Sequence, residues 1–218
     1  MGAPTGTTAA DPRSRRPARL DDGRLVRGRA SRARIREAAL ALFREQGFDG
    51  ATLRAIGARA GMGASSIYRH VRSKEELLVD DLAARQEEAW TSFRKDDDRR
   101  QPCRDRLVRF LRVQHALLAR EPDLTTIALR ATTHPERRVA RRVLALHDRT
   151  IGLVTEILMS GRMRGEIARE ADVVAAARAV LHLTQGARIS WANGLLEADE
   201  CEGAIEASVA LLLRGLEA

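Results

Sequence analysis

Apolar residues in this chain recur three and four positions apart, a spacing that places them on one face of an α-helix. In the clearest case the apolar face consists of Ile35, Ala38, Ala39, Leu42 and Phe43. Ser31 is a suitable N-cap for this helix. Gly47 stands where a helix commonly ends, and Phe48 after it is placed to touch Phe43. The pattern predicts a helix from about residue 31 to residue 46.

Residues 52–74 predict two short helices joined by a glycine-rich turn. Thr52 can cap the first helix, and Gly61-Met62-Gly63 forms the turn. Ile67 and Val71 are four residues apart and anchor the second helix to a core. This is the layout of a helix-turn-helix, whose second helix enters the major groove of DNA.

The remaining sequence is helical, without the alternation that is typical of strands. Ser73 and Glu76 form an S-x-x-E capping box for the next helix. Further helices are predicted from Arg104, from Pro122, from Pro135, after Asp172 and from Asp199. The predicted fold class is all-α: an N-terminal three-helix helix-turn-helix domain followed by a six-helix body.

The chain carries a formal net charge of +8, which suits a polyanionic partner such as DNA. Arginine supplies all but two of its 38 basic residues, and a GC-rich genome gives the same bias, so the total charge discriminates weakly. Seven arginines lie ahead of the first predicted helix: Arg13, Arg15, Arg16, Arg19, Arg24, Arg27 and Arg29. Residues 1–30 are therefore predicted to form a basic disordered arm, either a DNA contact or a solvated tail.

Several classes of protein find no support in the sequence. Membrane spans and a signal peptide are not expected, so the predicted location is cytoplasmic. Cys103 and Cys201 have no metal-ligand spacing, and neither a metal nor a cofactor is expected. Hydrolase, metalloprotease and Walker A motifs do not occur, so an enzyme is not predicted. Residues 61–66 match a degenerate G-x-G-x-x-G, but the stretch before them predicts a helix and not the strand that a dinucleotide site requires.

The block from about residue 34 to residue 82 resembles the DNA-binding domain of the tetracycline-repressor (TetR) family. The run IYRHVRSKEELL, residues 67–78, is very close to the commonest ending of that family's recognition helix. The resemblance also includes the apolar face at residues 35–43, Gly47, Thr52, Ile56 and Gly61. Two departures are Gly57 in place of the usual alanine and Gly63 in place of a capping serine or threonine.

The resemblance implies which residues meet DNA. Thr52 is expected at a phosphate and Arg54 at a base edge. Gly63, Ala64, Ser65 and Ser66 are expected to start the recognition helix close to the backbone of the duplex. Further contacts to phosphates are expected from Tyr68, His70 and Lys74, and Arg69 is expected at a phosphate or a base.

The rest of the chain resembles the family's C-terminal domain only loosely, through Gly165-Glu166-Ile167 and the alanine-rich helix that ends near Trp191. The resemblance implies that the last two long helices pair with a second copy as a four-helix bundle. Apolar stripes on these helices are the predicted dimer interface: Val173, Ala177, Val180, Thr184, Trp191, Val209, Leu212, Leu213 and Leu216. The predicted domains are 31–77 for DNA binding and 78–218 for ligand binding and dimerisation.

Polar groups on apolar helix faces are candidates for a ligand pocket. His115 follows Leu111 on one helix, and His147 precedes Ile151 on another. With Gln185 these five residues form the predicted ligand site. A histidine that is hydrogen-bonded to the protein itself is the alternative at both positions.

The predicted function is that of a homodimeric transcriptional regulator that acts as a repressor, as the resemblance implies. It is expected to bind a palindromic operator in double-stranded DNA and to be released by an unidentified small-molecule effector. The alternative is an architectural DNA-binding protein that responds to no ligand, which predicts sequence-tolerant binding with a steep dependence on salt.

Overall fold

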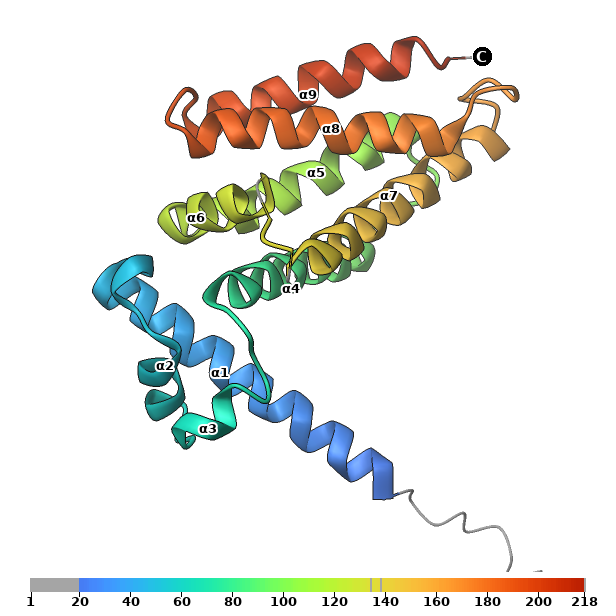
Figure 1. The fold of residues 1–218 in the computed structure, drawn as a ribbon. Helices are drawn as coiled ribbons and strands as arrows, with labels where there is room; N and C mark the ends of the chain where they lie inside the picture. Colours follow the sequence, from blue (N-terminus) through green and yellow to red (C-terminus); the bar gives the residue numbers. More distant parts are fainter. Residues whose placement is uncertain (1–19, 134, 138, 218) are drawn as a thin grey trace, which may run out of the picture.

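The computed structural model describes residues 20–133, 135–137 and 139–217 (Figure 1). Its helices are α1 Leu20–Gly50, α2 Leu53–Arg59, α3 Ala64–Ile67, α4 Lys74–Lys95, α5 Cys103–Ala119, α6 Pro122–Thr133, α7 Ala140–Met163, α8 Val173–Ala192 and α9 Ala198–Arg214. The described residues contain no β-strand beyond one isolated antiparallel bridge between Ile167 and Glu217. The predicted all-α class, a helix-turn-helix domain followed by six further helices, is confirmed.

The first helix begins earlier than predicted. α1 starts at Leu20 and not near Ser31, so the prediction of a disordered arm is wrong for residues 20–30. This stretch has no apolar periodicity, and Gly23 and Gly28 are poor helix formers, so neither pattern nor propensity indicates the helix. Its N-terminal end extends past α3 in Figure 1. Arg24, Arg27 and Arg29 therefore belong to a helix, whereas Arg13, Arg15, Arg16 and Arg19 lie outside the described residues.

Gly47 interrupts α1 where the sequence predicted the helix to end. Its φ of 73° lies in the region that favours glycine, but its ψ of 165° is not that of the left-handed helix. The chain then makes a short helical segment up to Gly50. The Phe43 and Phe48 rings lie 5.1 Å apart, which confirms the predicted contact across the interruption.

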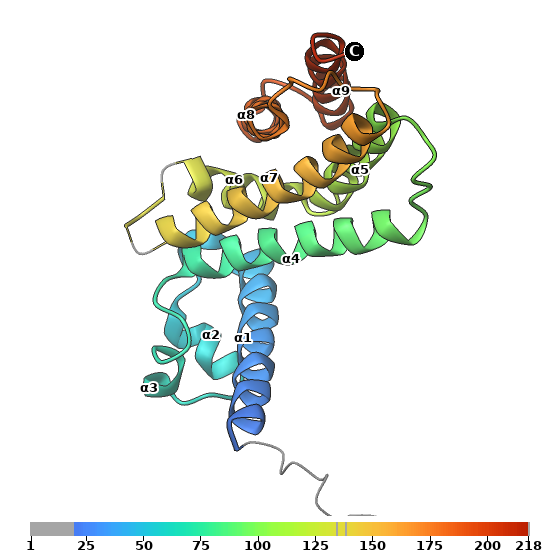
Figure 2. The ribbon, with the colours of Figure 1, turned by 90° about the vertical axis from the view of Figure 1, so that its right-hand side faces the viewer.

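The body is layered on the helix-turn-helix. In Figure 2, α4 lies beside α1–α3, while α5, α6 and α7 follow, and α8 and α9 form the layer farthest from the DNA-binding domain. α8 packs against α6, α7 and α9. No helix among the described residues is long and apolar enough to cross a membrane.

Two helices start at other residues than predicted. α7 begins at Ala140 and not at Pro135, after a turn in which the amides of Val139 and Ala140 both donate to the carbonyl of Glu136. α9 begins two residues earlier than expected, with Glu197 and Glu200 forming its capping box. Residues 197–202 offer two possible capping pairs, Glu197 with Glu200 and Asp199 with Glu202, and the sequence analysis chose the second.

The helix-turn-helix and the body share a hydrophobic core. The cluster that contains Ile35, Ile56 and Ile67 continues through α4 into Leu118 of α5 and Leu124 of α6. A second cluster fills the space among α4, α5, α7, α8 and α9. The predicted boundary between residues 77 and 78 falls inside α4, where both leucines are buried in the first cluster. The DNA-binding domain is thus packed directly onto the body.

Candidate functional site

The helix-turn-helix is held together by local contacts. The hydroxyl of Thr52 accepts a hydrogen bond of 3.1 Å from the amide of Ala55, as its predicted role as N-cap requires. Ile56 of α2 and Ile67 of α3 are fully buried. Gly57 lies against Ile67, where a Cβ atom would come within 3.3 Å of the isoleucine Cβ. The glycine therefore permits the close approach of α2 and α3.

The recognition segment, residues 64–71, consists of the short helix α3 and the tighter turn that follows it. α3 has four residues, and Gly63 at its N-cap provides no side-chain hydrogen bond. The amides of Arg69 and His70 donate to carbonyls three residues earlier, while the amide of Val71 donates to the carbonyl of Ile67. One face of this segment is buried and the opposite face is open.

Most predicted DNA contacts lie on that open face. The side chain of Tyr68 is 58% exposed, which is unusual for a large aromatic residue without a partner. The exposed group also includes Thr52, Arg54, Gly63, Ser65 and Arg69. Ser66 and His70 are half-buried, and Ala64 is the first residue of α3. Arg69 donates to the hydroxyl of Ser66 at 3.0 Å, which holds its guanidinium beside the helix.

Lys74 differs from the prediction. Its ammonium donates to the carbonyl of Phe48 at 2.7 Å and lies 4.4 Å from the centre of the Phe48 ring. A weaker contact reaches the carbonyl of Asp49 at 3.4 Å. The charge of Lys74 therefore stabilises the end of α1, and only part of its hydrogen-bonding capacity remains for a phosphate.

Glu76 joins the recognition segment to the body. The amide of Glu76 donates to the hydroxyl of Ser73 at 3.3 Å, which is one half of the predicted capping box. The other half is missing, because the Glu76 carboxylate accepts from the amide of Arg72 at 2.8 Å instead of from Ser73. The same carboxylate forms an ion pair with Arg142 of α7, which also pairs with Asp80.

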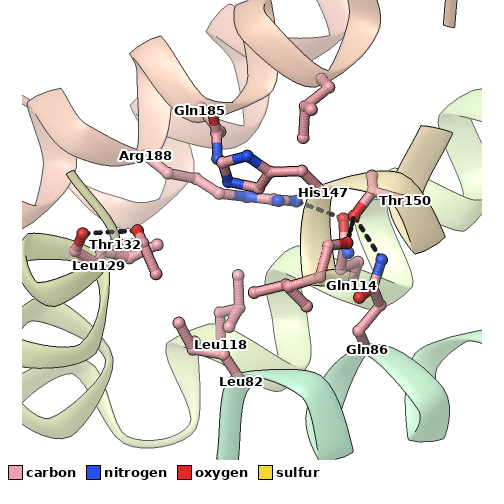
Figure 3. Close-up of a pocket in the computed structure, with 12 residues that line it drawn as sticks. Leu82, Gln86, Gln114, Leu118, Leu129, Thr132, His147, Thr150, Gln185 and Arg188 are labelled. Atoms are coloured by element: carbon pink, nitrogen blue, oxygen red, sulfur yellow. Dashed lines mark hydrogen bonds between the residues drawn. The ribbon is translucent and has the colours of Figure 1, made fainter. Parts of the chain in front are cut away.

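An internal cavity of about 50 Å³ lies among α4, α5, α6, α7 and α8 (Figure 3). Leucines form its apolar walls: Leu82, Leu118, Leu129, Leu146 and Leu181. Polar side chains reach it from the surrounding helices: Gln86, Gln114, Thr132, His147, Thr150, Gln185 and Arg188. A volume of this size holds a few water molecules.

The polar groups of the cavity are only partly paired with one another. A ring nitrogen of His147 lies 2.6 Å from the amide nitrogen of Gln185, and Gln86 donates to the hydroxyl of Thr150. The amide oxygen of Gln86 is buried without a partner. Burial lowers the pKa of His147, and the charge of His182 acts in the same direction. His147 is therefore neutral at pH 7 and can accept or donate one hydrogen bond at its Nε2 atom.

Arg188 of α8 is the one charged group that lines this cavity, and its side chain is almost wholly buried. It donates to the amide oxygen of Gln114 at 2.8 Å, while its Nε atom has no partner. Burial lowers the pKa of Arg188 to about 10, so the guanidinium remains protonated at pH 7. Removing an ion from water costs several kcal/mol unless a counter-charge offsets it.

The predicted ligand residues divide into two groups. His147 and Gln185 line the cavity and contact each other, whereas Leu111, His115 and Ile151 do not line it. The Nε2 atom of His115 lies 2.8 Å from the carbonyl oxygen of Ala198, which is the alternative that the sequence left open. Leu111 and Ile151 pack in the core of the body.

Arg188 was missed, although the sequence contains a signal for it. It continues the inward-facing series Ala177, Val180, Leu181 and Thr184 on α8, so it occupies a position where an apolar residue is expected. Gln86 and Gln114 carry the same signal on α4 and α5. The fact that these three residues meet one another cannot be read from spacing within any single helix.

The predicted dimer interface stays a prediction, but its residues already pack within a single protomer. Six of the nine residues, Val173, Ala177, Val180, Thr184, Val209 and Leu213, are buried inside the protomer's own core. The other three, Trp191, Leu212 and Leu216, are partly buried against that core. An apolar stripe marks a buried face, whether the protein itself or a partner covers it.

Residues 35–80 match the family model described as bacterial regulatory proteins of the tetR family. The chain is 29% identical over 182 residues to the HTH-type transcriptional repressor KstR of Rhodococcus jostii, covering 84% of this chain and 82% of KstR. It is 25% identical over 165 residues to the HTH-type transcriptional regulator UidR of Escherichia coli, covering 76% of this chain and 83% of UidR.

Solved structures share the fold over most of its length. The TetR-family repressor FadR of Thermus thermophilus, solved in complex with lauroyl-CoA, has a TM-score of 0.69 at 23% identity and covers 86% of this chain and 95% of its own. FadR of Bacillus subtilis, solved with stearoyl-CoA, has a TM-score of 0.67 at 17% identity, with coverages of 85% and 99%. Residues 35–80 therefore form a DNA-binding domain of the tetR family, and over most of its length the chain is similar in sequence and fold to transcriptional regulators of the TetR type.

Proposed function

We propose that this regulator is a homodimeric repressor, which binds a palindromic operator and is released when a small molecule enters the internal cavity. The observation that carries the DNA-binding part is the open face of the recognition segment, where Tyr68 stays 58% exposed while Ile67 beside it is fully buried. The half-sites lie about one helical turn apart, so that two recognition segments read one face of the duplex.

The first experiment is a mobility-shift titration with the DNA upstream of the chain's own coding sequence. Specific binding predicts that this fragment competes at least about 10³-fold better than random DNA of equal length. Equal competition by random DNA would favour the architectural alternative.

Two substitutions separate contacts to phosphates from contacts to bases. Tyr68→Ala should weaken binding to all sequences alike, because a contact to phosphate carries no sequence information. Arg54→Ala should cost about 1–3 kcal/mol and relax the preference at one base position. Identical effects of both changes on a library of operator variants would contradict this division.

For the dimer we propose the outer face of α8 and α9, defined by Leu183 and Gly186 on α8 and Gly203, Ala207 and Leu211 on α9. Leu211 is 64% exposed and Leu183 is 37% exposed, so apolar side chains lie on this face without cover. The residues on α9 recur every four positions and are mostly small, which permits close approach of a second helix. This face replaces the inward stripe that the sequence suggested.

Leu211→Arg tests this face, because a charge at the centre of a two-fold interface meets its own copy. Sedimentation analysis should show monomers, and operator affinity should fall. Leu144→Arg is the control: this leucine is 59% exposed near the start of α7, and the change should leave the dimer intact.

Two contacts support transmission of a signal from the cavity to DNA. Leu82 and Leu118 line the cavity and also belong to the core that contains Ile35 and Ile67. α7 contributes His147 and Thr150 to the cavity and pairs through Arg142 with Glu76. A ligand that pushes α7 or these leucines aside therefore shifts the recognition segment and changes the spacing between the two copies.

The proposed effector has an aliphatic body, because the apolar walls of the cavity are leucines. The lauroyl-CoA and stearoyl-CoA bound to the two FadR proteins are consistent with such a body. Release of the operator by an effector, measured by fluorescence anisotropy, also separates this proposal from the architectural alternative, which predicts no response to small molecules.

A further inference from the structure

Arg188 presents a buried positive charge to the cavity without a counter-charge. Only 6% of the residue is exposed, and its side chain crosses the cavity toward Gln114 in Figure 3. The Gln114 oxygen that accepts the hydrogen bond from Arg188 carries no charge, and the Nε atom of Arg188 has no acceptor. Over the described ranges, no carboxylate forms an ion pair with Arg188, whereas many exposed arginines of this chain have one.

The other lining groups do not supply that charge. His147 is neutral, and the three glutamines are amides. Thr150 accepts from Gln86 and donates to the carbonyl of Leu146 at 3.1 Å. Among the described residues, the lining therefore combines one unpaired cation and several neutral polar groups with a wall of leucines, and it includes no Phe, Tyr or Trp.

We infer that the effector is an aliphatic carboxylic acid, whose carboxylate pairs with Arg188 and whose hydrocarbon body lies against Leu82, Leu118 and Leu129. This inference rests on the proposed effector-released repressor and specifies the chemistry of its ligand. A guanidinium matches a carboxylate through two parallel hydrogen bonds, and an alcohol offers it neither this geometry nor a counter-charge.

The size of the cavity makes binding and movement inseparable. A space of about 50 Å³ cannot hold a chain of eight carbons, so the acid must displace part of the leucine wall. Leu82 and Leu118 are the walls that also pack in the core of the helix-turn-helix. The charge thus selects the ligand, and the hydrocarbon body moves the wall.

Isothermal titration of the full-length protein with octanoate, octanamide and octanoyl-CoA tests the inference. The acid and the amide have the same body and nearly the same shape, but only the acid is charged. Octanoate should bind at least about tenfold more tightly than octanamide, and Arg188→Gln should abolish the difference. Arg141→Gln removes an exposed arginine of α7 and should preserve it.

Three results would overturn the inference. Equal binding of octanoate and octanamide to the wild-type protein would show that the ligand's negative charge does not contribute to binding. Octanoyl-CoA binding equally to the wild-type and Arg188→Gln proteins, with no binding of octanoate, would assign the cavity to a thioester. Binding of sodium phosphate as tight as that of octanoate would assign Arg188 to any small anion.

A measurement without ligand provides an independent check. If Arg188 is kept for an acid and not for the fold, Arg188→Met combined with Gln114→Leu should leave the melting temperature unchanged or raise it by about 2–4 °C. A fall of the same size would show that the arginine is structural and would overturn the inference.

The operator assay separates this inference from the proposed function. Octanoate that binds in the calorimeter but leaves the operator complex intact would support the acid site and contradict effector release. Operator release by octanoyl-CoA alone, through a site that ignores Arg188, would support the proposed function and reject the acid.

Discussion

The recognition segment and the internal cavity use polar side chains in opposite ways. On the recognition segment, Tyr68 is exposed, and it depends on the buried Ile67 directly beside it in the sequence. In the cavity, Gln86, Gln114 and Arg188 are buried, and they come from helices far apart along the chain. The recognition segment is identified by large and polar side chains that remain exposed, and the cavity is identified by polar side chains that are buried in the core. The predictions below test this contrast, beginning with the largest effect.

The largest effect on stability is expected at Ile67, the buried residue that anchors the recognition segment to the core. Ile67→Ala should reduce the free energy of unfolding by about 2–5 kcal/mol, because Ile67 is fully buried against α2 and the change leaves a cavity. Operator affinity should fall with it, although Ile67 does not face DNA. Urea denaturation measures the loss, and Leu144→Ala at an exposed position of α7 should cost less than about 0.5 kcal/mol. Equal losses would show that burial is not the cause.

The same contrast explains what the sequence could predict. The cap at Thr52, the interruption at Gly47 and the buried pair Ile56 and Ile67 depend on neighbours within about one helical hairpin, so periodicity and capping rules identify them. The sequence therefore predicted the class and the number of helices. The prediction failed where the sequence has no apolar periodicity, as at the start of α1, which extends to Leu20.

Long-range packing limited the prediction of the cavity and the dimer. His147 and Gln185 were identified separately, but their contact across α7 and α8 depends on how these helices cross. His115 has the same local pattern as His147, and yet it meets the carbonyl of Ala198 instead of the cavity. For the dimer, the apolar stripe on α8 gave the buried face correctly and could not indicate which molecule buries it.

An intermediate effect is expected at the ion pair that connects the two regions. Glu76→Gln removes the charge that pairs with Arg142, and it weakens the acceptor for the amide of Arg72. The cost should be about 1.5–3 kcal/mol, in the range for hydrogen bonds to charged groups in partly buried sites. A double-mutant cycle with Arg142→Gln should give a coupling energy of about 0.5–2 kcal/mol. Independent losses would mean that α7 and the recognition segment are not joined here, and Asp80→Asn is the control for the second partner of Arg142.

A smaller effect is expected from the cap of α2. Thr52→Ala removes the acceptor for the amide of Ala55 and should cost about 1 kcal/mol of stability, and Thr52→Ser should recover most of it. If Thr52 also contacts a phosphate, Thr52→Ala lowers operator affinity by more than the loss of stability explains, and Thr52→Ser restores it. Affinity that follows stability alone, measured well below the melting temperature, would reduce Thr52 to a purely structural role.

The smallest effect is expected from the protonation of the cavity. Burial lowers the pKa of His147 in the folded protein, with the charge of His182 adding to the effect and Asp148 opposing it. The folded state therefore binds a proton less readily than the unfolded state, whose histidine keeps its ordinary pKa. The stabilisation is complete above that ordinary pKa and is lost as the pH falls from about 7 toward the lowered value. His147→Gln should flatten this part of the pH profile in urea denaturation, while His182→Gln, which removes an exposed histidine of α8, should retain most of the slope. A wild-type profile that rises as the pH falls through this window, and does so only when His147 is present, would mean that His147 gains a proton on folding and is not the neutral group described above.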